Sequence, residues 1–293
     1  MRTNPARLPS FYAVGPTRTA TTWLYQVLEG RVGLPAGIKE TQFFIWNYNL
    51  GLDWYLAHFR DCPGDLPLME IAPTYFDSEV ARRRVALHVP SARIICTLRD
   101  PVERAWSHYK HWQQLGLIKA PFEVAAFTHS QIVSAGRYAG HIRAWQNDFG
   151  ADNVLILLYD DLRADPQRYV DTLASFIGIS HFDLSRSPVA NTKVNHAERM
   201  PRSHRSARRA RKLRDFLIRR RLHRLIRLGE PLWQACFKGG DPYPPLDPAL
   251  ELRLRQHLEP EVEQLEHLLN RDLSSWKTGI AAPALNAAGS ASR

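Results

Sequence analysis

Four short apolar runs, separated by segments with helical periodicity, constrain the fold of this chain more than any other feature. They lie at residues 10–15, 68–72, 93–98 and 153–159. Their apolar residues are continuous, as in strands that are buried on both faces. The pattern predicts an α/β fold in which helices flank both faces of a parallel sheet. We expect the helices at 20–29, 77–88, 101–114, 138–148, 166–177, 206–227 and 247–269.

The first run ends in a loop with the spacing of a phosphate-binding loop. Gly15 to Thr22 reads G-P-T-R-T-A-T-T, which fits G-x-x-x-x-G-K-[ST] with Ala20 for the second glycine and Thr21 for the lysine. The cation lies inside the loop instead, at Arg18. Backbone N–H groups and hydroxyls at the start of a helix favour an anion. A threonine-rich cap without a ligand is the alternative, because such caps are common before helices.

Three stretches, taken in order, resemble the sulfotransferases that use 3′-phosphoadenosine 5′-phosphosulfate (PAPS). They read GPTRTATTWL from Gly15, KETQFF from Lys39 and RIICTLRDPVERAWSHYKH from Arg93. The resemblance extends over residues 10–277, and KETQFF is most similar to the carbohydrate-type branch, which includes heparan sulfate enzymes and bacterial relatives. It implies the P-loop-like sulfotransferase fold, PAPS as co-substrate, and no metal, since sulfonate transfer needs only donors on the leaving phosphate.

The resemblance implies roles at the sulfonate end of the donor. Arg18 stands where the family usually has lysine, and arginine keeps its proton at neutral pH, so we expect it to stabilise the leaving oxygen electrostatically. Glu40 is the expected catalytic base for an alcohol, although Gln42 replaces the histidine of the family's KE-x-H-F-F. His108 and His111 are alternative bases. The residues expected to hold the 5′-phosphosulfate are Arg18, Thr19, Ala20, Thr21 and Thr22.

Other positions match contacts to the rest of the nucleotide. Arg99 and Ser107 match the family's contacts to the 3′-phosphate, which a guanidinium fork and a hydroxyl can recognise together. A helix-capping bridge between Arg99 and Asp100 is the alternative. Trp23 matches a position that stacks on adenine, with a core role as its alternative. Further candidates near the donor are Lys39, Gly136, Arg137, Tyr138 and Arg202.

The sequence thus predicts an enzyme that moves a sulfonate from PAPS to a hydroxyl of a carbohydrate, glycolipid or natural-product acceptor by in-line attack. A P-loop kinase is one alternative, but the loop lacks its lysine, and only Asp160 and Asp161 are placed to organise magnesium. A non-catalytic binder of anionic ligands on the same scaffold is the other. Magnesium-dependent turnover of ATP would favour the kinase.

The formal charge of +10 is concentrated in one segment. Residues 199–227 hold 13 Arg or Lys and one acid, whereas the remaining 264 residues are nearly balanced. Apolar residues recur there at three- and four-residue intervals, which predicts an amphipathic basic helix over about 199–228. It could be a solvated face, a cover over the nucleotide, a dock across 205–227 for an anionic substrate or membrane surface, or a nucleic-acid patch. We expect no nucleic acid as partner.

Length and composition predict one sulfotransferase domain over residues 1–277 and a disordered tail over 278–293. No apolar run approaches the ~18 residues that a transmembrane helix needs, and an apolar leader region is absent from MRTNPARLPS. We therefore expect a cytoplasmic protein that begins near Met1 and contacts membranes only peripherally. The three cysteines imply neither a disulfide framework nor a metal site.

Overall fold

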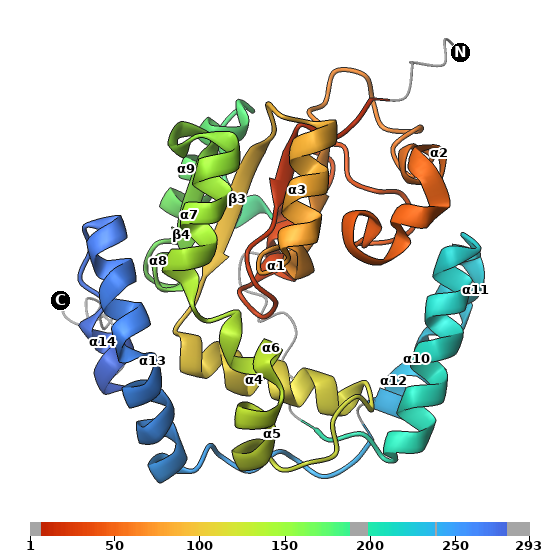
Figure 1. The fold of residues 1–293 in the computed structure, drawn as a ribbon. Coiled ribbons are helices and arrows are strands. Elements are labelled where there is room, and N and C mark those ends of the chain that lie inside the picture. Colours follow the sequence, from red (N-terminus) through yellow and green to blue (C-terminus); the bar gives the residue numbers. More distant parts are fainter. Residues whose placement is uncertain (1–6, 188–198, 238, 280–293) are drawn as a thin grey trace, which may run out of the picture.

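The computed structural model describes residues 7–187, 199–237 and 239–279. Its centre is a four-stranded sheet with the order β2-β1-β3-β4, in which every neighbouring pair is parallel (Figure 1). Tyr12 on β1 lies beside Glu70 on β2 and Ile94 on β3. The predicted α/β fold is therefore confirmed. The strands are β1 (Phe11–Ala13), β2 (Met69–Ile71), β3 (Arg93–Leu98) and β4 (Val154–Leu158).

Helices cover both faces of the sheet because successive strand residues point to opposite sides. Tyr12 and Val14 belong to a core shared with α3 (Glu79–His88) and α7 (Tyr138–Phe149). Phe11 and Ala13 belong to a second core shared with α1 (Thr21–Leu28) and α9 (Pro166–Ile177). The predicted runs for these helices agree with the structure to within two residues. Shorter helices that the periodicity did not predict are α2 (Gly51–Leu56), α5 (Phe122–Thr128), α6 (Ser130–Ser134), α8 (Tyr159–Ala164), α12 (Glu230–Phe237) and α14 (Ser274–Thr278).

Helix α4 (Pro101–Gln114) follows β3 and crosses below the carboxyl ends of the strands (Figure 1). The Asp100 side chain caps it by accepting hydrogen bonds from the Val102 and Glu103 amides at 2.8 and 3.1 Å. Pro101 is its first residue, where a missing N–H costs nothing. Ligands of open parallel sheets lie beyond these strand ends, so α4 is placed to line a site.

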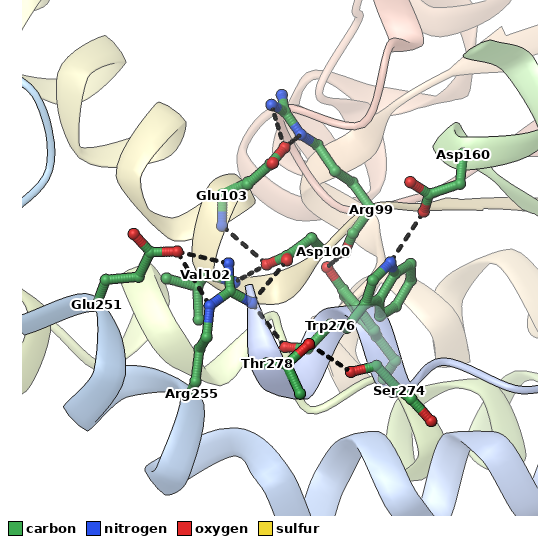
Figure 2. Close-up of polar contacts among 11 residues, drawn as sticks. Arg99, Asp100, Val102, Glu103, Asp160, Glu251, Arg255, Ser274, Trp276 and Thr278 are labelled. Carbon is green, nitrogen blue, oxygen red and sulfur yellow. Dashed lines mark hydrogen bonds and ion pairs between the residues drawn. The ribbon is translucent and has the colours of Figure 1, made fainter. Parts of the chain in front are cut away.

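The C-terminal helices α13 (Pro248–Leu269) and α14 fix the start of α4 from outside (Figure 2). Buried Arg255 pairs with Asp100 at 2.8 Å and also donates to the Trp276 carbonyl at 2.7 Å. The Trp276 indole in turn donates to Asp160 at 2.9 Å. Helix α14 includes Thr278, the first residue of the expected tail, and residues 280–293 lie outside the described residues.

The basic segment forms two helices, so the prediction of one helix over 206–227 is wrong. Helix α10 (His204–Arg219) ends where Arg221 adopts a left-handed conformation with φ of 57°. The Arg221 amide donates to the Ile218 carbonyl and the Leu222 amide to the Leu217 carbonyl, both at 2.9 Å. This pattern closes a helix end, and α11 (His223–Leu228) begins after it as a separate helix. Among the described residues, no helix is long and apolar enough to span a bilayer.

Candidate active site

The loop between β1 and α1 has a strained backbone. Arg18 and Ala20 adopt φ values of 78° and 68°, in the left-handed region that side chains with a Cβ disfavour. Ala20 precedes α1 without a side-chain cap. Conformations of this kind cost about 1–3 kcal/mol each and concentrate at ligand sites. The strain supports an anion-binding role for the loop, whose amides lie at a helix start.

Replacement of Ala20 by glycine is expected to raise the free energy of unfolding by about 1 kcal/mol, because glycine adopts positive φ without a steric penalty. Urea unfolding would measure the change. The matched control is Ala81→Gly inside α3, which has ordinary helical geometry and should lose about 1 kcal/mol or more. Equal destabilisation by both variants would contradict the assignment of strain to the loop.

The loop is anchored to β3 beneath it. The buried Thr19 hydroxyl donates to the Pro16 carbonyl at 2.7 Å and also contacts the Thr97 hydroxyl at 2.7 Å. A Cβ on Gly15 would lie 2.3 Å from the Thr97 amide nitrogen, so only glycine fits there. Thr19 therefore holds the loop in place through its side chain, and only its backbone remains as a candidate ligand for phosphate.

Two side-chain contacts join the loop to α4. Arg18 Nε donates to Ser107 Oγ at 2.9 Å, and Thr17 Oγ1 lies 3.1 Å from His108 Nδ1. The sequence motifs predict that Arg18 contacts the sulfonate end of the donor and that Ser107 contacts its 3′-phosphate. The structure brings the two side chains into direct contact. A ligand that binds Arg18 would therefore also lie next to Ser107.

The KETQFF segment lies against the same loop. Lys39 Nζ lies 3.4 Å from the Thr21 hydroxyl and 2.8 Å from Glu40 Oε1. The Gln42 amide donates to the other Glu40 oxygen at 2.8 Å. The half-buried Glu40 carboxylate is thus held between Lys39 and Gln42 at the edge of the phosphate loop. Gln42, which replaces the family's histidine, orients the candidate base.

A buried carboxylate supports this segment from beneath. Glu70 on β2 is fully buried and accepts hydrogen bonds from the Thr41 hydroxyl and from the hydroxyls of Tyr55 (2.7 Å) and Tyr75 (3.2 Å). Tyr75 also accepts from the Phe44 amide at 3.0 Å. Burial raises the pKa of Glu70 from 4.5 to about 7, against the opposing effect of its hydrogen bonds. The motifs do not include Glu70; its only signal in the sequence is that it is the one acid inside the apolar run LMEIA.

The electrostatic environment of the site favours anions. Burial, and secondarily the charge of Arg99, lower the pKa of Arg18 to about 10, so the guanidinium stays charged at neutral pH. Burial and the charges of Arg18, Lys39 and Arg214 lower the pKa of His111 to about 3. The pKa of His108 also falls well below its usual value, through burial and the charge of Arg104. Both histidines are therefore neutral and weakly basic at pH 7, which favours Glu40 as the base.

Arg99 lies at the carboxyl end of β3 and pairs with Glu103 at 2.7 Å, as Figure 2 shows. Asp100 caps α4 and pairs with Arg255, so the alternative bridge between Arg99 and Asp100 is not formed. The Tyr138 hydroxyl donates to the Arg99 carbonyl at 2.6 Å, which brings a further predicted residue to this point.

The other members of the predicted loop 136–138 differ in their surroundings. Gly136 packs closely on α4, since a Cβ there would lie 3.1 Å from Pro101 Cβ. Arg137 is exposed and lies 3.8 Å from Glu261 on α13. Gly136 thus borders the start of α4 and Tyr138 contacts Arg99, whereas the Arg137 side chain turns toward α13.

Trp23 and Arg202 lie in surroundings that do not favour their predicted roles. Trp23 is only 7% exposed and packs edge-to-face on Tyr169, with ring centroids 6.0 Å apart. This position in the core favours packing over stacking on adenine. Arg202 is exposed and donates to the Gly239 carbonyl at 3.3 Å. Thr22 is half-buried in the first turn of α1 beside Thr21, a place that fits its predicted role in holding the 5′-phosphosulfate.

The two carboxylates that a kinase would need are engaged in structural contacts. Asp161 forms two hydrogen bonds of 2.6 Å with Arg271, and Asp160 accepts from the Trp276 indole (Figure 2). Both contacts tie α8 to the C-terminal helices. The geometry therefore gives the kinase alternative no support.

Comparisons with known proteins agree with this geometry. The sulfotransferase domain family matches residues 9–217. The human bifunctional heparan sulfate N-deacetylase/N-sulfotransferase 3 is 34% identical over 207 residues, which cover 62% of this chain and 24% of that protein. The bifunctional heparan sulfate N-deacetylase/N-sulfotransferase 1 of Xenopus laevis is 33% identical over 200 residues, which cover 60% of this chain and 23% of that protein. The chain thus spans about a quarter of the length of these relatives.

A solved structure of a sulfotransferase from Alicyclobacillus acidocaldarius shares the fold. It superposes with a TM-score of 0.65 at 20% identity and covers 92% of this chain and 99% of its own. Together with the match over residues 9–217, these findings define the class of protein: an α/β protein with the sulfotransferase fold. The chain belongs to the sulfotransferase domain family.

Proposed function

We propose that this protein transfers a sulfonate group from PAPS to a hydroxyl of a carbohydrate, glycolipid or natural-product acceptor. One observation carries the proposal: Lys39 links the Glu40 carboxylate to Thr21 of the phosphate loop. A candidate base therefore stands at the edge of an electropositive anion site. That pairing is what sulfonate transfer to an alcohol requires.

The residues present fit an adenine nucleotide with phosphates at two positions. Arg18, Lys39 and Arg99 supply positive charge, and the loop amides supply donors at a helix start. Arg18 and Ser107 already contact each other, and Arg99 is paired with Glu103. Binding of the 3′-phosphate would exchange these two contacts for contacts with phosphate oxygens.

In the proposed reaction Glu40 removes the proton of the acceptor hydroxyl as its oxygen forms a bond to sulfur. The bond between sulfur and the 5′-phosphate oxygen breaks, and that oxygen leaves with the electron pair. Arg18 stabilises the developing negative charge because its guanidinium remains protonated. Lys39 neutralises charge beside the base, and Gln42 holds the carboxylate in position. The products are a sulfate ester and adenosine 3′,5′-bisphosphate.

Adenosine 3′,5′-bisphosphate should bind at least about tenfold more tightly than AMP, because charge-assisted hydrogen bonds to the 3′-phosphate are worth about 1.5–3 kcal/mol. Calorimetry in the presence of EDTA would measure both affinities. Arg99→Ala and Ser107→Ala should lower the affinity for the bisphosphate and leave the affinity for AMP nearly unchanged. Arg83→Ala, which removes an exposed arginine paired with Glu79 on α3, is the matched control.

Equal affinity for AMP and the bisphosphate would overturn the assignment of Arg99 and Ser107. Turnover of ATP that depends on magnesium would replace the proposal with the kinase. A screen of hydroxyl-bearing carbohydrates, glycolipids and natural products with radiolabelled PAPS would identify the acceptor class, and failure to label any acceptor while the bisphosphate binds tightly would favour a non-catalytic binder.

A further inference from the structure

The basic arm, defined as residues 203–237 and containing α10, α11 and α12, combines positive charge with exposed apolar side chains. It holds 11 Arg or Lys and two acids. Six of the 13 exposed large hydrophobic side chains in the described residues belong to it. Exposed apolar surface is therefore concentrated where the chain is most basic. The six are Leu213, Phe216, Leu222, Leu225, Leu228 and Leu232, with exposed fractions between 42% and 78%.

The arm is fixed to the rest of the protein along its inner face. Ala207, Ala210 and Leu217 of α10 are buried. The Trp54 indole donates to the Arg219 carbonyl at 3.2 Å, and Arg221 donates to the Ala57 carbonyl at 2.8 Å. The arm stands at one side of the molecule, with the turn between α10 and α11 beside α2 (Figure 1). These contacts determine which side chains face outward.

One stripe of α10 shows the pattern most clearly. Arg209, Leu213, Phe216 and Arg220 are spaced by four, three and four residues, so they share one helix face, and all four are exposed. Arg220 Cζ lies 5.6 Å from the centre of the Phe216 ring. An apolar centre flanked by arginines is typical of a helix that lies in a membrane interface, where long basic side chains reach the headgroups.

We propose that the basic arm docks on the surface of an anionic phospholipid bilayer. Leu213 and Phe216 enter the boundary between headgroups and acyl chains, and Arg209 and Arg220 contact lipid phosphates. The apolar residues distinguish a bilayer from other polyanions, because a nucleic acid would satisfy the arginines and leave the apolar side chains in water. The proposal does not rest on sulfonate transfer and holds for an inactive protein as well.

Sedimentation of the full chain with vesicles tests the proposal. Wild-type protein should bind vesicles that contain phosphatidylglycerol mixed with phosphatidylcholine, and it should not bind vesicles of pure phosphatidylcholine. Leu213→Ser with Phe216→Ser should weaken binding by roughly tenfold or more through lost apolar burial. Arg209→Gln with Arg220→Gln should also weaken it by roughly tenfold or more, through lost attraction to anionic lipid. The matched control is Leu87→Ser, which changes an exposed leucine on α3.

The four substituted residues of the α10 stripe are exposed. Both double variants should therefore keep the wild-type melting temperature and the wild-type affinity for adenosine 3′,5′-bisphosphate. Undiminished vesicle binding by the Leu213→Ser, Phe216→Ser protein would overturn the proposal and indicate a general polyanion surface. Failure of the wild type to bind anionic vesicles would overturn it as well. A dimer in solution that these two substitutions convert to a monomer would identify the patch as an interface between copies.

Discussion

Glu40→Gln is expected to lower kcat for sulfonate transfer by about 10²–10⁴-fold, the contribution typical of a positioned general base. Glutamine keeps the size of the side chain and a carbonyl oxygen near Lys39, but it cannot accept the acceptor's proton. Transfer of radiolabelled sulfonate from PAPS to the acceptor that the screen identifies would measure the loss. The effect should fall on kcat, because the base acts in the transition state.

Two controls separate a lost base from a disturbed site. Calorimetry should give Glu40→Gln the same affinity for adenosine 3′,5′-bisphosphate as the wild type. Glu79→Gln removes a carboxylate that forms an exposed pair with Arg83 on α3 and should leave transfer unchanged. Full activity of Glu40→Gln would place the base elsewhere. If that variant also bound the bisphosphate normally, the assignment of the nucleotide site would hold and only the assignment of Glu40 as the base would be rejected.

The sequence predicted the sheet and the segments of the site because both depend on local patterns. The continuous apolar runs placed all four strands, and α4 was predicted at its observed bounds of 101–114. The three motifs identified the loop at 15–22, Glu40 and Ser107, which the structure brings together through the contacts of Arg18 and Lys39. Strand ends of a parallel sheet meet at one edge, so local motifs were sufficient for this part of the site.

The features that the sequence did not predict depend on tertiary contacts. Helical periodicity continues through Arg221, so it gave no sign of the break between α10 and α11. The place of Trp23 in the core became evident only from its contact with Tyr169, which lies 146 residues away in the sequence. The partners of Glu70 come from three separate segments. No spacing rule connects such residues.

The Glu70 cluster is a structural link between the sheet and the proposed base. Thr41 follows Glu40 directly and donates to Glu70, and the Thr41 carbonyl accepts from Asn47 at 2.8 Å. The segment that carries Glu40 is thereby attached to β2 through the Thr41 hydroxyl, in addition to the link from the Phe44 amide through Tyr75. The protonation state of Glu70 therefore affects the free energy of unfolding, and it does so through contacts that also position the segment carrying Glu40.

Glu70→Gln is expected to change how stability depends on pH. The pKa of Glu70 is about 7 in the folded protein and near 4.5 when unfolded, so between these values the folded state holds a proton that the unfolded state has lost. The contribution of Glu70 to stability should therefore fall as pH rises from 4.5 through 7, by about 3 kcal/mol at 1.36 kcal/mol per pH unit. Glutamine cannot ionise, and urea unfolding of both proteins from pH 4.5 to 8 would show the variant gaining that amount relative to wild type.

The difference between the two proteins isolates Glu70, because the other titrating groups are common to both. His108 and His111 act with the opposite sign: their depressed pKa values make stability fall as pH drops below 6.5. That contribution cancels in the comparison. Glu79→Gln, at an exposed position, should differ from wild type by an amount that hardly changes with pH. A constant difference between wild type and Glu70→Gln would mean that the buried carboxyl keeps one protonation state across this range, and it would remove the proposed link between that proton and the stability of the segment carrying the base.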